Sequence, residues 1–135
     1  MNAMVLHNDE LELKKLEGGC ARKVLSHNKD MMMVEVHFAE GSKGALHTHP
    51  HTQCTYVRSG LFEFTIDGEN VIVGPGDSIC FEPNVPHGTL CLEAGILIDC
   101  FTPAREDFLK KHEKIRQTPL VMQRVRRIFL FQMRR

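Results

Sequence analysis

Short segments in which apolar and polar residues alternate one by one are the feature that most limits how this chain can fold. Side chains along a β-strand point to opposite faces with a period of two, whereas an amphipathic helix repeats about every 3.6 residues. The alternation therefore predicts strands with one face in a core and the other toward water. Three segments show it most clearly, with apolar positions at Val34, Val36 and Phe38, at Phe62, Phe64 and Ile66, and at Ile79 and Phe81.

Turn residues separate these segments. Asp67-Gly68 follows Ile66 directly, which is a strong signal for a two-residue hairpin. Two further turns are expected at 74–77, which reads Gly-Pro-Gly-Asp, and at 83–86, which reads Pro-Asn-Val-Pro. Strands joined in this way indicate an all-β fold, either an antiparallel sandwich or a barrel. Because 42% of the 135 residues are hydrophobic, one core can form, and we expect a single domain over 1–109.

Charge is distributed unevenly along the chain, although the formal net charge is zero. Residues 1–109 contain 8 Lys and Arg against 16 Asp and Glu, whereas residues 110–135 contain 9 against 1. Apolar residues between 121 and 129 recur at helical spacing, and Thr118-Pro119 is a helix-start signal that Thr102-Pro103 repeats. A basic amphipathic tail can bind a membrane or nucleic acid. We expect neither partner, and instead a C-terminal helical segment docked on the acidic body or on a second subunit.

The amino-terminal residues do not resemble an export signal, because charged and apolar residues are mixed there, and no apolar run approaches the length that spans a membrane. Five cysteines, an odd number with no C-x-x-C pair, argue against a disulfide framework and for a reducing compartment. We therefore expect a cytoplasmic protein in which the cysteines serve as small apolar residues of the core.

Three histidines, His47, His49 and His87, form the main candidate site. His47 and His49 are two residues apart, so on an extended strand both imidazoles would point to the same face and could bind one ion. Three imidazole ligands with open positions are typical of a catalytic metal site rather than a closed structural one. His51 shares this parity, but Pro50 interrupts the strand, so we place His51 at the rim of the pocket.

A second candidate cluster follows within the apolar stretch 95–101. Asp99 has apolar strand neighbours, and burial of a carboxylate there is costly unless the group is paired or used. Asp99 and Phe101 share one strand face, and Arg105 follows in what would be the first turn of a helix begun by Pro103. The planar fork of Arg105 suits a carboxylate. A structural ion pair between Asp99 and Arg105 is the alternative explanation, and the two readings are compatible.

Two motifs resemble those of the cupin superfamily. The first spans 41–60 and contains Gly41, His47, His49, Gln53 and Gly60. The second spans 76–87 and ends at His87. The resemblance implies a double-stranded β-helix, the cupin jelly-roll barrel, and one divalent metal ion held by His47, His49, Gln53 and His87.

The chain departs from the usual cupin motifs at four positions, Gln53, Glu82, Asn84 and Cys91. Asn84 stands where glycine is common, and asparagine tolerates the left-handed backbone that such a turn needs. Gln53 stands where most cupins have Glu. A neutral amide leaves the full charge on a bound ion, which should make the ion a stronger Lewis acid toward substrate oxygens.

Within the superfamily, the chain is similar to the small pectin-degradation cupins of the KdgF type. These share an HxHPHxQ run, a strand-end Asp-x-Phe and an Arg four residues beyond the Phe, and the resemblance covers about 41–109. It implies an enzyme that converts 4,5-unsaturated monouronates, released from pectin or alginate, to the linear ketonized uronate. In that reaction Asp99 would be the general acid/base, Arg105 would hold the substrate carboxylate, and Phe101 would form a wall of the pocket.

Two other function classes stay open. A metal-dependent dioxygenase would use the same histidines with iron, although Gln53 weakens the electron-rich ligand set that oxygen activation favours. A non-catalytic sugar-binding or sensing module is the second alternative, and the basic tail supports it.

The imidazole and amide metal ligands accept Zn, Ni, Mn, Fe or Co alike. Since cupins usually pair and open sheet edges favour association, we expect a homodimer.

Overall fold

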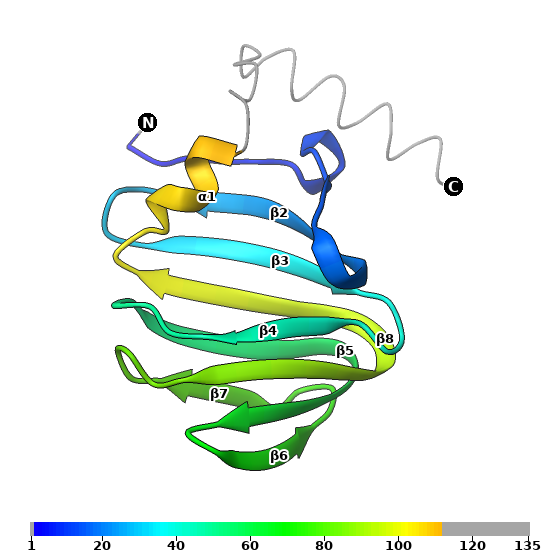
Figure 1. Cartoon of the computed structure of the whole chain (residues 1–135). Helices are drawn as coiled ribbons and strands as arrows, with labels where there is room; N and C mark the ends of the chain where they lie inside the picture. The colour runs from blue at the N-terminus through cyan, green and yellow to red at the C-terminus, as the bar shows by residue number, and fades with distance from the viewer. Residues whose placement is uncertain (1, 112–135) are drawn as a thin grey trace.

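The computed structural model describes residues 2–111, and Figure 1 shows a β-barrel with the short helix α1 at one end. The strands are β1 (Lys14–Lys15), β2 (Cys20–His27), β3 (Met32–Phe38), β4 (Lys43–His47), β5 (Thr52–Ile66), β6 (Glu69–Val73), β7 (Ser78–Phe81) and β8 (His87–Thr102). Two 3-10 turns, η1 (Asn8–Glu10) and η2 (Glu17–Gly19), and the helix α1 (Glu106–Lys111) complete the described elements. The expected all-β jelly-roll fold is confirmed. The predicted helix beyond Thr118 lies outside the described residues.

All strand pairs are antiparallel, and the two long strands β5 and β8 hold the barrel together. The first part of β5 pairs with β7 and with the end of β8, whereas its second part pairs with β6 and with the beginning of β8. β3 extends the sheet from β8 toward β2 and β1, and β4 pairs with the beginning of β8. Each long strand therefore contributes to both layers of the barrel.

Glycine marks the corner where β5 passes from one layer to the other. The β5–β8 register shifts three times between Val57 and Phe62, which is how an antiparallel ladder bends. Gly60 lies inside this region with φ of 86°, and a Cβ at that position would approach the Glu93 carbonyl oxygen to 2.7 Å. Only glycine accommodates both the left-handed backbone and this close approach.

The local predictions from alternation and turn residues are confirmed. Asp67 and Gly68 both have positive φ, 49° and 83°, and they join Ile66 to Glu69 in a tight hairpin. The expected inward-facing residues fill the barrel, and the most deeply buried among them are Val34, Phe62, Phe64 and Phe81.

The predicted helix start at Thr102-Pro103 is wrong. Thr102 is the last residue of β8 and pairs with Thr52, and the α-helix begins only at Glu106. The Ala104 N–H donates to the Lys29 carbonyl at 3.2 Å, so this segment is held as a loop by a distant part of the chain. α1 then packs its apolar residues against the buried cluster at this end of the barrel.

The prediction that the cysteines are core residues is wrong for two of them. Cys20 and Cys91 are buried, but Cys54 and Cys80 are exposed and Cys100 is half-buried. The reason is strand parity, since Cys54 alternates with the buried residues Gln53 and Thr55 and therefore points outward.

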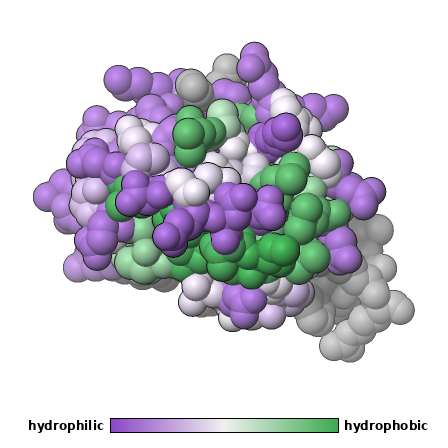
Figure 2. Space-filling model, turned by 60° about the horizontal axis from the view of Figure 1, so that its bottom comes forward, coloured by the Kyte–Doolittle hydropathy of each residue, from purple (hydrophilic) through white to green (hydrophobic). Residues whose placement is uncertain are grey.

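Large apolar side chains are also exposed elsewhere on the barrel, among them Leu46 in β4 and Val71 and Ile72 in β6. Figure 2 shows hydrophobic residues gathered on the side of the molecule at which β6 lies in Figure 1. Surfaces of this kind often contact another protein chain. The homodimer expected from the sequence stays a prediction.

Among residues 2–111, no helix is both long and apolar enough to cross a membrane.

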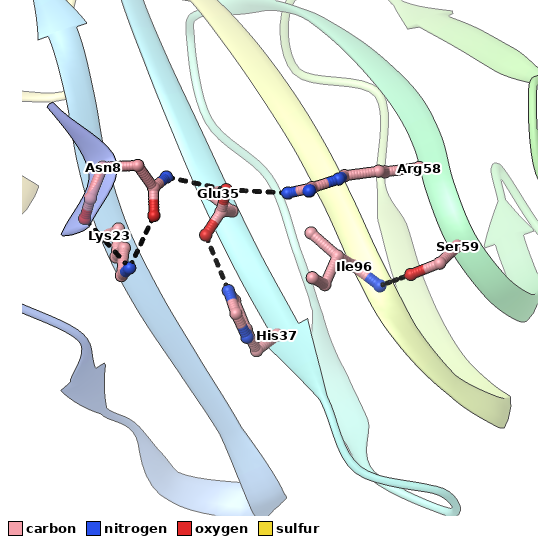
Figure 3. A network of polar contacts seen from close by, with 7 residues as sticks. All are labelled: Asn8, Lys23, Glu35, His37, Arg58, Ser59 and Ile96. Carbon is pink, nitrogen blue, oxygen red and sulfur yellow. Dashed lines mark hydrogen bonds and ion pairs between the residues drawn. The ribbon is translucent and has the colours of Figure 1, made fainter. Parts of the chain in front are cut away.

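A buried carboxylate on the outer face of the sheet ties the N-terminal segment to the barrel (Figure 3). Glu35 is 3% exposed and accepts hydrogen bonds from His37 at 2.7 Å, Asn8 at 3.1 Å and Arg58 at 3.3 Å. Burial by itself would raise the pKa of Glu35. The hydrogen bonds from His37 and Asn8 and the charges of His37 and Lys23 outweigh burial, so its pKa is lowered.

Replacement of Glu35 by Gln should lower the free energy of unfolding by about 1–3 kcal/mol near neutral pH, because a neutral amide accepts weaker hydrogen bonds. The folded pKa of Glu35 lies below the unfolded one, so its stabilisation is complete above about pH 4.3 and is lost as the pH falls through the folded value. Urea denaturation of both proteins at neutral and acidic pH measures the difference, with the exposed Glu69→Gln as control. A difference that does not shrink in acid would contradict this account.

Candidate functional site

Three imidazoles meet at one end of the barrel. His47 is the last residue of β4, His87 is the first residue of β8, and the two are paired across the strands. Their ring centroids lie 4.4 Å apart, and His49 lies 5.0 Å from His87. One nitrogen from each of the three rings lies within 4.8 Å of the others, so the three residues could hold one metal ion.

His49 reaches this cluster from a loop rather than from the strand. The expected extended strand ends at His47, so the parity argument does not apply to His49. The His49 carbonyl instead accepts a hydrogen bond of 2.8 Å from the Asn84 N–H, which joins its loop to the turn before β8. Asn84 has φ of 66°, which lies in the left-handed region that asparagine was expected to tolerate.

Backbone carbonyls orient all three rings in the same way. The Nδ1 atoms of His47, His49 and His87 lie 2.7, 3.2 and 2.9 Å from the carbonyl oxygens of Ala45, His51 and Val85. A carbonyl can only accept, so Nδ1 carries the proton in each ring and Nε2 carries a lone pair. Among the described residues, the buried Nε2 of His87 has no hydrogen-bond partner. A cation would satisfy it.

Gln53 adds a fourth donor atom to this set. Its Nε2 donates to the Thr55 hydroxyl at 2.9 Å, and this hydroxyl donates to Asp99 Oδ1 at 2.6 Å. The amide oxygen of Gln53 therefore faces His49 Nε2, at 2.8 Å. Two lone pairs this close need a positive centre between them, either a proton or a metal ion. Three imidazole nitrogens and one amide oxygen fit a late first-row divalent ion.

Burial keeps the imidazoles of His49 and His87 neutral and ready to act as ligands. It lowers the pKa of His87 to about 4, and the charges of His47, His49 and Arg105 act in the same direction against the hydrogen bond to Val85. Burial also lowers the pKa of His49. Metal ligands must be unprotonated, so near neutral pH a divalent cation does not have to displace protons from His49 and His87.

Asp99 and Phe101 point from β8 into the same cavity as the imidazoles. The cavity has a volume of about 250 Å³, and its lining includes His47, Gln53, His87, Asp99 and Phe101. Burial raises the pKa of Asp99 to about 6, although hydrogen bonds from Thr55 and Gln53 and the charge of Arg105 oppose the rise. The buried Phe101 ring lies edge-on to His49, with centroids 5.6 Å apart.

Arg105 also lines the cavity, but its ion-pair partner is Asp107 rather than Asp99. Nε and Nη2 each donate to a carboxylate oxygen of Asp107 at 3.0 Å. The guanidinium carbon lies 4.2 Å from the centroid of Phe108 and 5.1 Å from that of Phe101. The structural ion pair with Asp99 that the sequence left open is thus replaced by a local one. Two of five N–H donors are used in it, so the others can face a ligand.

Arg22 and Thr55 belong to this site and were missed from the sequence. Arg22, from β2, lines the cavity at 7% exposure, with its guanidinium carbon 3.7 Å from the Phe108 centroid. Burial lowers the pKa of Arg22, with Asp107 opposing this and Arg105 reinforcing it. The signal was strand parity, since Arg22 shares the inward face of Cys20 and Val24, and Thr55 shares the face of Gln53.

His51 lies beside the cluster, half-buried, with its ring centroid 5.4 Å from that of His49 and 6.3 Å from that of Phe101. Burial lowers its pKa, and the charge of Arg105 lowers it further. This placement agrees with a position at the rim of the pocket.

An antiparallel jelly-roll barrel with an imidazole cluster in its mouth defines a cupin, and residues 34–97 match the model of the cupin domain family. The chain is 44% identical over 104 residues to the pectin degradation protein KdgF of Dickeya dadantii, covering 76% of this chain and 94% of that protein. The structure of KdgF from Halomonas sp. matches with a TM-score of 0.76 and 35% identity, over 79% of this chain and 99% of that one. An RmlC-like cupin from Shewanella frigidimarina matches with a TM-score of 0.75 and 38% identity, over 80% and 99%. The chain belongs to the KdgF family of cupins.

His87→Ala should abolish stoichiometric binding of a divalent metal. Loss of a residue that merely orients a ligand weakens metal binding by about 10- to 100-fold, so loss of the ligand itself should weaken it at least as much. Elemental analysis after dialysis against each metal measures the content. His27→Ala, a histidine outside the cluster, is the matched control and should bind as the wild type does. Equal metal content in His87→Ala and wild type would overturn the assignment.

Proposed function

We propose that this chain acts in pectin or alginate breakdown as a metal-dependent enzyme that converts 4,5-unsaturated monouronates to the linear ketonized uronate. The name of its relative supports the general role, since that protein is called a pectin degradation protein. One observation supports the particular reaction: a carboxylate, a guanidinium and an imidazole cluster line a single small cavity, represented by Asp99, Arg105 and His87. These are the groups that proton transfer and the binding of a sugar acid require.

The proposed reaction is an isomerisation that needs no oxidant. The anomeric hydroxyl loses its proton, and its electron pair forms the aldehyde as the bond from the anomeric carbon to the ring oxygen breaks. The ring oxygen takes up a proton and becomes an enol hydroxyl. Delivery of a proton to the former alkene carbon and loss of the enol proton then give the ketone. The enzyme has to move protons between oxygen and carbon while it holds the ring and its carboxylate.

Asp99 is the acid/base in this proposal. Its carboxylate lies in the cavity, and the hydrogen bond of 2.6 Å from Thr55 holds Oδ1 in place. The carboxyl group lines the cavity, where it can exchange a proton with the substrate. A carboxyl group whose pKa is about 6 is populated in both protonation states near neutral pH, which suits both halves of the transfer.

Arg105 binds the substrate carboxylate, and Arg22 adds a second positive charge to the same cavity. The aromatic rings of Phe101 and Phe108 restrict the guanidinium of Arg105, which reduces the entropy lost on binding. Phe101 forms an apolar wall that excludes water. A divalent ion held by His47, His49, Gln53 and His87 would polarise substrate oxygens as a Lewis acid.

Asp99→Asn should reduce kcat by about 10²- to 10⁴-fold, the usual range for loss of an acid/base group, and should leave metal content unchanged. Loss of the ultraviolet absorbance of lyase-generated unsaturated uronates measures turnover. Asp30→Asn, the same change at an exposed carboxylate, is the control. Full activity in Asp99→Asn would contradict the assignment.

The same assay separates the other two classes. Activity that requires oxygen would identify a dioxygenase. Saturable binding of a uronate that is recovered unchanged would identify a sugar-binding or sensing module.

Arg105→Lys should raise KM more than it lowers kcat. A charged hydrogen bond contributes about 1.5–3 kcal/mol, so replacement of the planar fork by a point charge should raise KM by about 10-fold or more. Arg58→Lys, the same change on the outer face of the sheet, should leave both constants unchanged. If KM is unaltered in Arg105→Lys while kcat falls, Arg105 acts in the chemical step and not as the carboxylate clamp.

A further inference from the structure

Four sulfur-containing residues form a row on the outer face of the barrel. Met33 pairs with Cys100 across β3 and β8, Cys100 pairs with Cys54 across β8 and β5, and Cys54 pairs with Cys80 across β5 and β7. Cys54 and Cys80 are exposed, Cys100 is half-buried, and Met33 is 39% exposed. Cys54 is the central thiol of the row, so it has two direct neighbours with which it could react.

The backbone hydrogen bonds decide which neighbour is closer. The N–H of Val57 donates to Asp77, and its carbonyl accepts from Gly76, so both groups of Val57 point toward the β7 side of β5. The backbone groups of successive strand residues point to opposite sides, and the register of β5 is regular from Gln53 to Tyr56 with β7 and to Val57 with β8. The backbone groups of Cys54 therefore point toward β8, away from Cys80.

Cys54 and Cys80 consequently form a non-hydrogen-bonded pair, whereas Cys54 and Cys100 form a hydrogen-bonded pair. Cα atoms are about 4.5 Å apart in the first kind of pair and about 5.5 Å apart in the second, and side chains approach more closely in the first. Disulfides span Cα separations of about 4.4–6.8 Å, so the Cys54–Cys80 pair lies at the short, strained end of this range. Strained and exposed disulfides are the reducible ones.

We propose that Cys54 and Cys80 are a redox-active dithiol that forms a reversible cross-strand disulfide by exchange with low-molecular-weight disulfides such as oxidised glutathione. Both thiols are accessible to such a reagent. The pKa of the Cys80 thiol is raised, first by its hydrogen bond with Cys54 and then by burial and by the charges of Cys54 and Glu82.

The exchange balances without a further oxidant. The Cys54 thiolate attacks one sulfur of the small disulfide, forms a mixed disulfide and releases one small thiol. The Cys80 thiolate then attacks the Cys54 sulfur and releases the second small thiol. Two electrons pass from the protein to the small disulfide, and the two cysteine protons end on the two released thiols.

This pair lies directly behind the candidate metal centre. The next residue pair along the same two strands is Gln53 with Phe81, on the inner face. The Phe81 ring stacks on His87, with centroids 4.4 Å apart and an angle of 25° between the rings. A covalent link between Cys54 and Cys80 would join β5 to β7 one residue away from these side chains.

The test uses the full chain, fully reduced and then equilibrated with mixtures of oxidised and reduced glutathione. After alkylation of the remaining thiols, digestion by trypsin and a glutamate-specific protease without reductant separates the candidates. Cys54 falls in 44–58, Cys80 with Cys91 in 70–93, and Cys100 in 94–105. The expected product links 44–58 to 70–93 within one chain. Cys80→Ser should abolish this link, and the matched control Cys100→Ser should retain it.

Three results would overturn the proposal. The first is a link between 44–58 and 94–105, which would make Cys100 the partner. The second is a link that survives in Cys80→Ser, which would assign it to Cys91. The third is a mixed disulfide or a covalent dimer on a non-reducing gel in place of the internal bond. Circular dichroism of each variant checks that the fold is intact, so failure to react cannot be confused with unfolding.

Discussion

Antiparallel pairing of β5 with β8 is the interaction on which the rest of this structure depends. Side chains alternate between the two faces, so a slip of one residue would move every inward group to the surface. All irregularities of this pairing lie between Val57 and Phe62, and the ladder before them is regular. Three consecutive pairs in the regular part supply both the pocket and the sulfur row: Gln53 with Phe101, Cys54 with Cys100, and Thr55 with Asp99.

This register also builds a continuous polar chain through the pocket. Asp99 accepts from Thr55, Thr55 accepts from Gln53, and the Gln53 oxygen is left facing His49. Each hydrogen bond fixes the direction of the next, and such bonds reinforce one another in a low-dielectric interior. The carboxylate at one end thus orients the amide at the other. Proposed proton transfer and proposed metal binding are therefore properties of one network rather than of two separate sites.

Local chemistry explains why some features could be predicted from the sequence and others could not. The Asp67-Gly68 hairpin and the inward Phe62 and Phe64 depend on residues close together in the chain, and these predictions are confirmed. The helix start at Pro103 failed because pairing of Thr102 with Thr52 extends β8 past the local signal. A contact between residues so far apart in the chain is invisible to a rule that reads neighbouring residues only.

The order of residues was enough to predict the strands, their turns and the cupin spacing of His47, His49 and His87. Alternation, turn residues and motif spacing are all properties of residues close together in the chain. Only the tertiary structure decided that Arg105 bonds Asp107, that Arg22 enters the pocket and that Cys54 pairs with both Cys80 and Cys100. These outcomes depend on which backbone groups face which neighbouring strand and on what else is buried beside them. Both are set when distant segments pair, and neither has a signature within any one segment.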